Sequence, residues 1–456
     1  MSAKFRLALA AGKSINTLVN IVDKSRGSNL SGEKALLLDS KMLSHFKGVD
    51  PSKVLFITGT NGKSTTNNLL NHILKDNGFK VISNLEGANL LAGVTTSMIK
   101  ASSLSGRVDA DYYLFETDER FLPIIREQLP AANILITNLQ KDQVQRNGDP
   151  DYIYRHLEKA FRGGVPRMFI NNDEPRSASL AKYSERSVSY GSEKHSQAFT
   201  KGESYVTMPC PVCRQKIDFE YYNTDGIGSF KCAHCGYESS KEADYTVRDI
   251  DFESGTFTVQ GVKFSMPYNT PYMIYNYAAC VAVAHEMCGI SIEDCAKSFG
   301  NFKNVGGRIQ VMRYKGKTIK YMRIKQENPE TFQSSINEMA NDPSRKMVAL
   351  GLAPLVDFVP HYAVSFYAYD CDFSKLVEGD VEKYFCFTDA VCYDTANRLI
   401  YEGVDKDIIS IADNEDPEQI FKEIEQAETD NVYLITWLHT YENMEKYLKK
   451  EGAEFE

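Results

Sequence analysis

The sequence predicts an α/β protein with three parts. These are a central domain on a parallel, doubly wound sheet, a four-cysteine zinc ribbon inserted into it, and a smaller α/β C-terminal domain. Residues 54–66 have the pattern of a buried strand, a glycine turn and the start of a helix. Strand-like and helical patterns then alternate, which is typical of a parallel sheet covered by helices. Two CxxC pairs interrupt this alternation between about residues 203 and 243.

The length of 456 residues predicts two or three domains at roughly 150 residues each. We expect a lead-in over 1–50, the central domain with its ribbon over 51–305, and the C-terminal domain over 306–456. Within the lead-in, the pattern predicts a helix around 7–22 and a short strand-like run at 35–39.

The composition is typical of a soluble globular protein, with 43% hydrophobic and 25% charged residues. A net charge of −9 argues against wholesale nucleic-acid binding, and no apolar run approaches the ~18 residues of a spanning helix. The apolar stretch near the N-terminus is cut short by Gly12 and Lys13, so it does not read as a signal peptide. Ten cysteines, four of them in CxxC pairs, indicate metal binding in a reducing compartment, and we predict a cytoplasmic protein.

The glycine turn predicts a phosphate-binding loop. Residues 54–57 form the strand, Gly59 and Gly62 bracket the turn, and Lys63 opens the helix. Such a turn points free N–H groups and the positive end of the helix dipole at one spot. Lys63 can reach the β- and γ-phosphates of ATP, and a hydroxyl after it can join the Mg²⁺ shell. The residues expected to contact ATP are Gly59, Thr60, Asn61, Gly62, Lys63, Ser64 and Thr65.

A second apolar run, residues 112–116, ends in the carboxylate of Glu116. A carboxylate at the carboxyl end of a parallel strand beside a phosphate loop is placed to handle the metal ion. We therefore predict that Glu116 acts in catalysis as a Mg²⁺ ligand together with Ser64. The alternative is a solvated acid that closes the strand.

The two CxxC pairs predict a structural zinc site. Cys210 and Cys213 form the first pair, and Cys232 and Cys235 follow after 18 intervening residues. Four thiolates at this spacing suit tetrahedral Zn²⁺. Because four sulfurs leave no open position on the metal, the site is expected to stabilise the fold rather than to catalyse a reaction.

The glycine loop resembles the ATP-binding loop of the Mur ligase family. It lacks the earlier glycine of the standard G-x-x-x-x-G-K-[ST] pattern, since Ile57 stands there. Segments 83–89, 137–143 and 171–175 resemble motifs of the MurT-type branch of this family, in the same order. That branch also carries a four-cysteine ribbon at this point of the chain, so the resemblance covers both features.

The resemblance implies further nucleotide contacts. Asn171 and Asp173 match residues beside the base and ribose. Arg308 matches the arginine of a Gly-Arg pair that marks the hinge into the C-terminal domain and reaches the nucleotide; the alternative is a surface arginine in a glycine loop. Residues 272–279 resemble the Tyr-Asn-x-x-Ala-Ala element of Mur ligases.

The C-terminal part resembles the MurT-type branch at 325–332 and 394–403 but departs from it at one catalytic position. The branch has an Asp-Gly segment that this chain lacks, and Asp357 is the only carboxylate near that place. We take Asp357 as the candidate substitute. His361 could serve instead as a neutral base, because its reference pKa is near ~6.5. The alternative for both is a solvated loop.

The function implied by the resemblance is an ATP-dependent amide ligase that uses ATP, Mg²⁺ and a structural Zn²⁺. ATP would activate the D-glutamate α-carboxylate of lipid II as an acyl phosphate, and ammonia from a GatD-like glutaminase subunit would convert it to D-isoglutamine. A lipid-linked substrate would bring the cytoplasmic chain to the inner face of the membrane. The alternatives are a Mur-type ligase that adds an amino acid and a nucleotide-binding scaffold without turnover. A nucleic-acid-binding ribbon protein is disfavoured by the negative charge.

Overall fold

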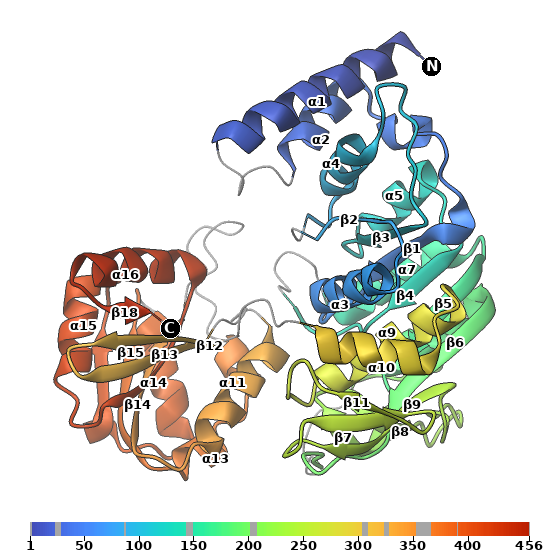
Figure 1. Ribbon diagram of the computed structural model, residues 1–456. Helices are drawn as coiled ribbons and strands as arrows, with labels where there is room; N and C mark the ends of the chain where they lie inside the picture. The colour runs from blue at the N-terminus through green and yellow to red at the C-terminus, as the bar shows by residue number, and fades with distance from the viewer. Residues whose placement is uncertain are drawn as a thin grey trace. The chain divides into compact units, whose positions relative to one another are not determined.

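The computed structural model describes residues 2–22, 29–85, 88–142, 149–200, 208–302, 309–322, 328–352, 366–389 and 391–455. The chain divides into two compact units. The first contains Met1–Gln140 and Pro150–Asn304, and the second contains Lys141–Asp149 and Val305–Glu456. Each unit is built around its own sheet (Figure 1).

The first unit holds a nine-stranded sheet in the order β11-β10-β9-β6-β5-β4-β1-β3-β2. The strands from β2 to β9 in this order pair in parallel, and β9, β10 and β11 pair antiparallel at one edge. The strands are β1 (Val54–Thr58), β2 (Val81–Ser83), β3 (Tyr112–Glu116), β4 (Asn133–Ile136), β5 (Val165–Asn171), β6 (Ser184–Ser192), β9 (Tyr245–Asp251), β10 (Thr256–Val259) and β11 (Val262–Ser265).

Helices cover both faces of this sheet, as the sequence predicts. In β1, Leu55 and Ile57 point to the face under α3, α9 and α10, while Val54 and Phe56 point to the face under α1, α4, α5 and α7. Every residue of β1 is therefore buried, which explains its continuous apolar run. The helices are α1 (Ala3–Val22), α2 (Leu30–Leu38), α3 (Lys63–Asp76), α4 (Leu91–Ala101), α5 (Leu122–Gln128), α7 (Pro150–Phe161), α8 (Pro175–Leu180), α9 (Met273–Glu286) and α10 (Ile292–Asn301).

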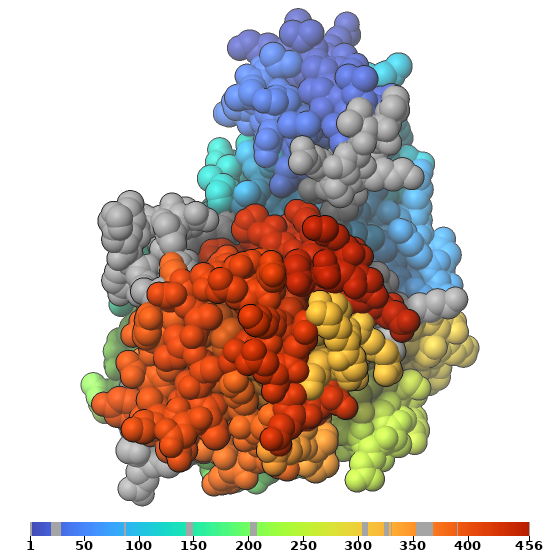
Figure 2. All heavy atoms as spheres, turned by 90° about the vertical axis from the view of Figure 1, so that its left-hand side faces the viewer, coloured from blue at the N-terminus to red at the C-terminus, as the bar shows by residue number. Residues whose placement is uncertain are grey.

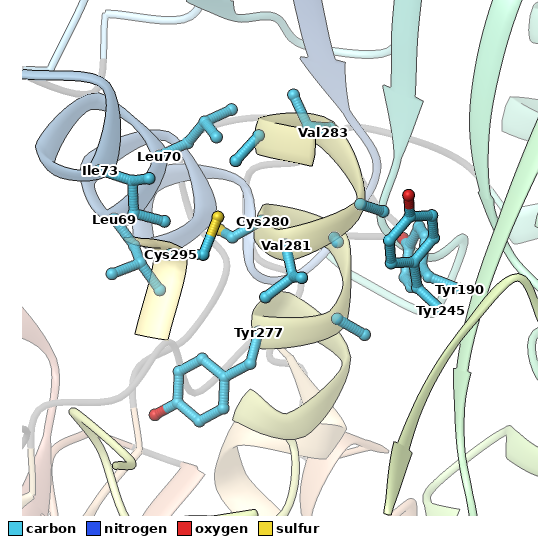
Figure 3. Close-up of a cluster of buried hydrophobic side chains, with 14 of the residues drawn as sticks. Leu69, Leu70, Ile73, Tyr190, Tyr245, Tyr277, Cys280, Val281, Val283 and Cys295 are labelled. Carbon is cyan, nitrogen blue, oxygen red and sulfur yellow. The ribbon is translucent and has the colours of Figure 1, made fainter. Parts of the chain in front are cut away.

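Helix α9 lies at the centre of the first face. Its residues from Met273 to Ala284 are all buried. Figure 3 shows leucine and isoleucine side chains of α3 pointing toward Cys280 on one side of α9, with Tyr190 and Tyr245 of the sheet on the other. Cys280 lies in α9 and Cys295 in α10, and both are buried in this core.

The described part of the lead-in includes the α-helices α1 and α2, and the predicted strand at 35–39 is wrong. Residues 35–38 form the last turn of α2. This helix packs tightly, because a Cβ on Gly32 would lie only 2.0 Å from the carbonyl oxygen of Ala92 on α4. In the space-filling view, the dark-blue atoms of the lead-in form one closely packed body with lighter-blue residues of the same unit (Figure 2). Within the described ranges, no helix combines the length and the apolar character needed to cross a bilayer.

The ribbon is inserted between the parallel strands β6 and β9. Its two strands, β7 (Asp218–Thr224) and β8 (Ile227–Lys231), form a separate antiparallel sheet. A small core of Cys210, Ile217, Phe230 and Cys232 lies beneath it.

The second unit holds a seven-stranded sheet in the order β16-β15-β14-β17-β13-β12-β18. One face packs against α11, α13 and α14, and the other against α15 and α16. The strands are β12 (Ile309–Tyr314), β13 (Lys317–Met322), β14 (Lys346–Gly351), β15 (Val381–Phe387), β16 (Ile409–Ala412), β17 (Asn431–Thr436) and β18 (Glu454–Phe455). The helices are α11 (Pro329–Asn341), α12 (Phe366–Tyr369), α13 (Ser374–Val377), α14 (Val391–Tyr401), α15 (Pro417–Glu425) and α16 (Leu438–Lys450).

Candidate functional site

The loop between β1 and α3 needs both of its glycines. Gly59 has φ of 123° and Gly62 has φ of 84°, values that side chains disfavour. A Cβ on Gly59 would lie 2.3 Å from Oγ1 of Thr137, and one on Gly62 would lie 2.2 Å from Oδ1 of Asn276 on α9. Asn276 belongs to the predicted Tyr-Asn-x-x-Ala-Ala element, whose place is therefore against the glycine loop.

Asn138 and Gln140, which follow β4, hold the apex of the glycine loop. The backbone amide of Thr60 donates to the Asn138 carbonyl at 2.7 Å, and the amide of Asn61 donates to the Asn138 side chain at 2.9 Å. The side chain of Asn61 donates to Oε1 of Gln140 at 2.9 Å. These hydrogen bonds hold the loop in a defined conformation. Sequence reasoning did not assign Gln140, although it lies within the segment 137–143 that resembles a family motif.

Lys63 begins α3, and its amino group turns back onto the loop. It donates to the carbonyls of Gly59 and Thr60, the latter at 3.1 Å. It also forms an ion pair with Glu119 at 3.1 Å, in which both side chains are nearly buried. Burial raises the pKa of Glu119, and the charge of Lys63 opposes that rise. Glu119 was missed from the sequence, because three acids close together at the end of β3 give no sign of which one meets the lysine.

Ser64 and Glu116, the predicted magnesium ligands, are brought together. The hydroxyl of Ser64 donates to Oε2 of Glu116 at 2.7 Å. The residue Glu116 is 4% exposed, and its carboxylate receives a longer contact of 3.4 Å from the Asn89 side chain. Asn84 fixes the backbone of Glu116 with two hydrogen bonds of 2.8 Å each. Hard oxygen donors held this close suit Mg²⁺. The alternative, a solvated acid that closes the strand, is therefore wrong, because Glu116 is buried.

Thr65 is half-buried at the same helix N-terminus. Together, the left-handed glycines, the lysine and the N-terminus of a 14-residue helix form a cradle that suits a polyphosphate. The residues present therefore fit ATP with Mg²⁺.

Asn171 ends β5 and Asp173 lies two residues beyond it, and both are buried. The Asn171 side chain donates to the Thr137 carbonyl at 3.2 Å. Asp173 accepts from the Ser192 amide at 2.9 Å and from the Tyr275 hydroxyl at 3.0 Å. Burial raises the pKa of Asp173 to about 6. These contacts shape the turn beside the loop, and the role of the two residues toward base and ribose stays a prediction.

Three predicted residues lie outside the part of the chain that the structure describes: Arg308, Asp357 and His361. Their roles stay predictions.

The four ribbon cysteines lie together and offer the sulfur atoms that a metal site needs. Their sulfur atoms all lie within 4.8 Å of one another. Each CxxC pair forms the same turn, in which Arg214 or Gly236, the residue after the second cysteine, has φ of 69° or 75°. The amides of Arg214 and Gly236 donate back to the first cysteine of their pair, at 2.9 Å in both turns. Four converging thiols in paired turns fit a tetrahedral Zn²⁺.

Two family models match the chain. The Mur ligase middle domain matches residues 57–212, and the MurT ligase C-terminal domain matches residues 326–444.

Curated relatives match over most of the length. The lipid II isoglutaminyl synthase subunit MurT of Staphylococcus aureus (strain COL) is 26% identical over 359 residues, which cover 78% of this chain and 79% of the relative. The subunit of the same name from Streptococcus pneumoniae (strain R6) is 25% identical over 446 residues and covers 95% of both chains.

Solved structures share the fold. The pseudomurein peptide ligase type C from Methanothermus fervidus superposes with a TM-score of 0.67 at 17% identity, covering 90% of this chain and 81% of that one. The MurF ligase from Thermotoga maritima in complex with ADP superposes with a TM-score of 0.56 at 17% identity, covering 92% and 84%.

Proposed function

The chain belongs to the Mur ligase family and carries a MurT-type C-terminal domain, and from this premise we propose that it is the synthetase subunit of an ATP-dependent amide ligase. It activates a carboxylate with ATP and amidates it with ammonia. The substrate that we assign is the α-carboxylate of D-glutamate in lipid II, and the product is D-isoglutamine. The relatives named above as lipid II isoglutaminyl synthase subunits support this choice.

The observation that carries the proposal is the convergence of Lys63, Ser64 and Glu116 at the start of α3. Phosphoryl transfer demands positioning and charge neutralisation more than covalent chemistry. Lys63 supplies a fixed positive charge for the β- and γ-phosphates. Ser64 and Glu116 would hold Mg²⁺, which neutralises the charge that develops on the transferred phosphoryl group.

The ammonia comes from another chain in this proposal. Outside the ribbon, six cysteines remain, and all are buried: Cys280, Cys288, Cys295, Cys371, Cys386 and Cys392. Burial raises the pKa of Cys288 and Cys386 to about 12, and it also raises the pKa of Cys280. Buried thiols with raised pKa values are poor nucleophiles. A GatD-like glutaminase partner supplies the ammonia instead.

Asp357 orients or deprotonates the ammonia at the acyl phosphate, with His361 as the alternative base. Arg308, Asn171 and Asp173 contact the nucleotide in this proposal, and Zn²⁺ holds the ribbon. The chain works in the cytoplasm and meets its lipid-linked substrate at the inner face of the membrane.

The test is an amidation assay with lipid II, ATP, glutamine and the partner glutaminase, read out by mass spectrometry of the stem peptide. We expect a loss of about 1 Da, from exchange of a carboxyl for an amide group. Asp357→Asn should abolish amidation while ADP binding is unchanged, and His361→Ala serves as the matched variant. Amidation at the parent rate in both variants would remove both residues from the mechanism.

A second candidate is a Mur-type ligase that adds an amino acid instead of ammonia. The match of residues 57–212 to the general Mur ligase middle domain supports it. Incorporation of a labelled amino acid in place of ammonia would establish this function. ADP binding without formation of either product would indicate a nucleotide-binding scaffold without turnover.

A further inference from the structure

The turn of the ribbon hairpin touches the residue that braces the glycine loop. Strands β7 and β8 are joined by Asp225 and Gly226, and Gly226 takes φ of 73° to close the turn. The side-chain amide of Gln140 donates to the carbonyl of Asp225. The oxygen of the same amide accepts from the side chain of Asn61 at 2.9 Å. One glutamine therefore bridges the ribbon and the loop.

The backbone of Gln140 adds a second connection to the loop. Its N–H donates to Oγ1 of Thr60 at 2.9 Å, and the Thr60 hydroxyl donates back to the Gln140 carbonyl at 3.2 Å. Thr60 and Asn61 are the two residues between the left-handed glycines. The loop therefore depends on outside contacts for its shape.

The ribbon also touches the turn that holds Asp173. The amide of Gly228 on β8 donates to the Asp173 carbonyl at 2.9 Å. Asn172 and Ser240 exchange two hydrogen bonds of 2.9 and 3.0 Å. The hairpin thus contacts both sides of the nucleotide site that the proposed function requires.

The cysteines fix the end of the hairpin opposite to this turn. Cys232 directly follows β8, whose five residues span roughly 16 Å at about 3.3 Å per residue. The same small core, including Cys210 and Cys232, packs beneath the two strands. Gathering the four thiols therefore sets the direction in which the hairpin turn points.

We infer that the ribbon hairpin is a positioning element of the nucleotide loop and that Gln140 is the positioning residue through which it acts. This inference rests on the proposed nucleotide site. A loop held in its binding conformation loses less entropy when the phosphates arrive, so bracing raises affinity without a direct contact to the ligand. The reaction chemistry stays with Lys63, Ser64 and Glu116.

The experiment measures ADP binding to the full purified chain by calorimetry. Gln140→Ala removes the side-chain link and is expected to weaken ADP binding about tenfold, the loss of two hydrogen bonds. In ATP hydrolysis, KM for ATP should rise by a similar factor while kcat changes less than about twofold, because the chemical groups are untouched. Gln140→Met keeps the side-chain volume and is the second variant, and thermal unfolding confirms that both fold.

Removing the metal with a chelator tests whether the ribbon acts on the loop through Gln140. Zinc removal should weaken ADP binding less in Gln140→Ala than in the parent chain, because the connection through Gln140 is already broken in the variant and only the contacts with Asn172 and Asp173 remain to be lost. Glu238→Gln breaks an exposed ion pair with Lys231 on the ribbon and should leave ADP binding unchanged.

Other outcomes would contradict the inference, the proposed function or both. Parent-like ADP binding by both Gln140 variants overturns the inference, and so does an equal effect of zinc removal in the parent and in Gln140→Ala. If the parent chain binds no ADP at all, the proposed function fails together with the inference. If it binds ADP and only the Gln140 effect is missing, the proposed function stands.

Discussion

At the scale of single residues, the amino group of Lys63 meets three acceptors: two loop carbonyls and the Glu119 carboxylate. The phosphates must compete with Glu119 for this charge. Asp118, one residue earlier, is held differently. Although burial favours its neutral form, hydrogen bonds from Arg120 outweigh that effect and lower the pKa of Asp118. The two neighbouring acids therefore have separate partners.

Lys63→Ala should lower ATP turnover by about a hundredfold or more, because a fixed donor to the transferred phosphate is lost. The change also leaves Glu119 buried without its lysine, which should reduce the free energy of unfolding by about 1–3 kcal/mol. Phosphate release and denaturant unfolding measure the two effects. The double variant Lys63→Ala/Glu119→Gln should regain stability but not turnover. Turnover near the parent rate in Lys63→Ala would remove the lysine from the mechanism.

The raised pKa of Asp173 predicts that the stability of the protein depends on pH. Its folded-state pKa of about 6 lies above its ordinary value of 3.8, so the folded state holds the proton more tightly than the unfolded state. Below about pH 4, the Asp173 carboxyl makes its full contribution to the free energy of unfolding. This contribution, about 3 kcal/mol in total, is lost as pH rises through about 6.

Unfolding of the parent and of Asp173→Asn, compared at each pH between 4 and 7, isolates this contribution. Other titrating groups cancel in the difference, among them His195, whose pKa burial lowers to about 4. A stability difference that does not vary across this range would contradict the assignment.

At the scale of elements, the sequence was most informative where strands are buried on both faces. The apolar runs at 54–57 and 112–116 are confirmed as β1 and β3, and every residue of both strands is buried. The run at 35–39 was misread because a short apolar run fits a strand or a buried helix turn equally well. Its place in α2 is decided by packing against α4, which no local pattern reveals.

Two hairpins were also missed, although their turns carry a signal. Gln260 and Gly261 join β10 to β11, and Lys315 and Gly316 join β12 to β13; all four residues have positive φ. Such two-residue turns favour glycine at the second position. In the candidate site, the loop and Glu116 could be predicted because each follows a strand. Glu119 and Gln140 could not, because their partners are set by tertiary contacts.

The prediction at the scale of elements concerns zinc in the ribbon. The purified chain should carry one Zn²⁺, because four sulfurs converge within 4.8 Å. Cys232→Ser removes one ligand and should release most of the metal. Elemental analysis of protein prepared without chelator measures both. A parent chain without zinc would contradict the site.

At the scale of the whole molecule, the two units have separate sheets and cores. The family resemblance, read first from motifs in both parts, is confirmed by the matches to residues 57–212 and 326–444. The catalytic carboxylate is the part that the sequence could not decide, because the Asp-Gly motif is absent and proximity alone favours Asp357.

If ammonia is made by a partner, the chain alone should amidate lipid II with ATP and ammonium chloride, and it should use glutamine only when the glutaminase is added. The rate with ammonium should rise with pH toward ~9, because free ammonia rather than ammonium is the nucleophile. Glutamine-dependent amidation by the chain alone would show that it carries its own glutaminase. Lys63→Ala is the inactive control.

The placement of the ribbon between β6 and β9 has a consequence for how the protein is made. Parallel neighbours need a long crossover, and in most folds this is a helix that forms by itself. Here the crossover contains four converging thiols, and if they bind zinc as proposed, the segment folds only when it acquires the metal. Strands β1 to β6 could then pair during synthesis before zinc arrives, whereas β9 to β11 would join the sheet only after the crossover has formed. In a zinc-starved cell, unfinished sheets would be exposed to proteases, so the amount of protein would follow the metal supply.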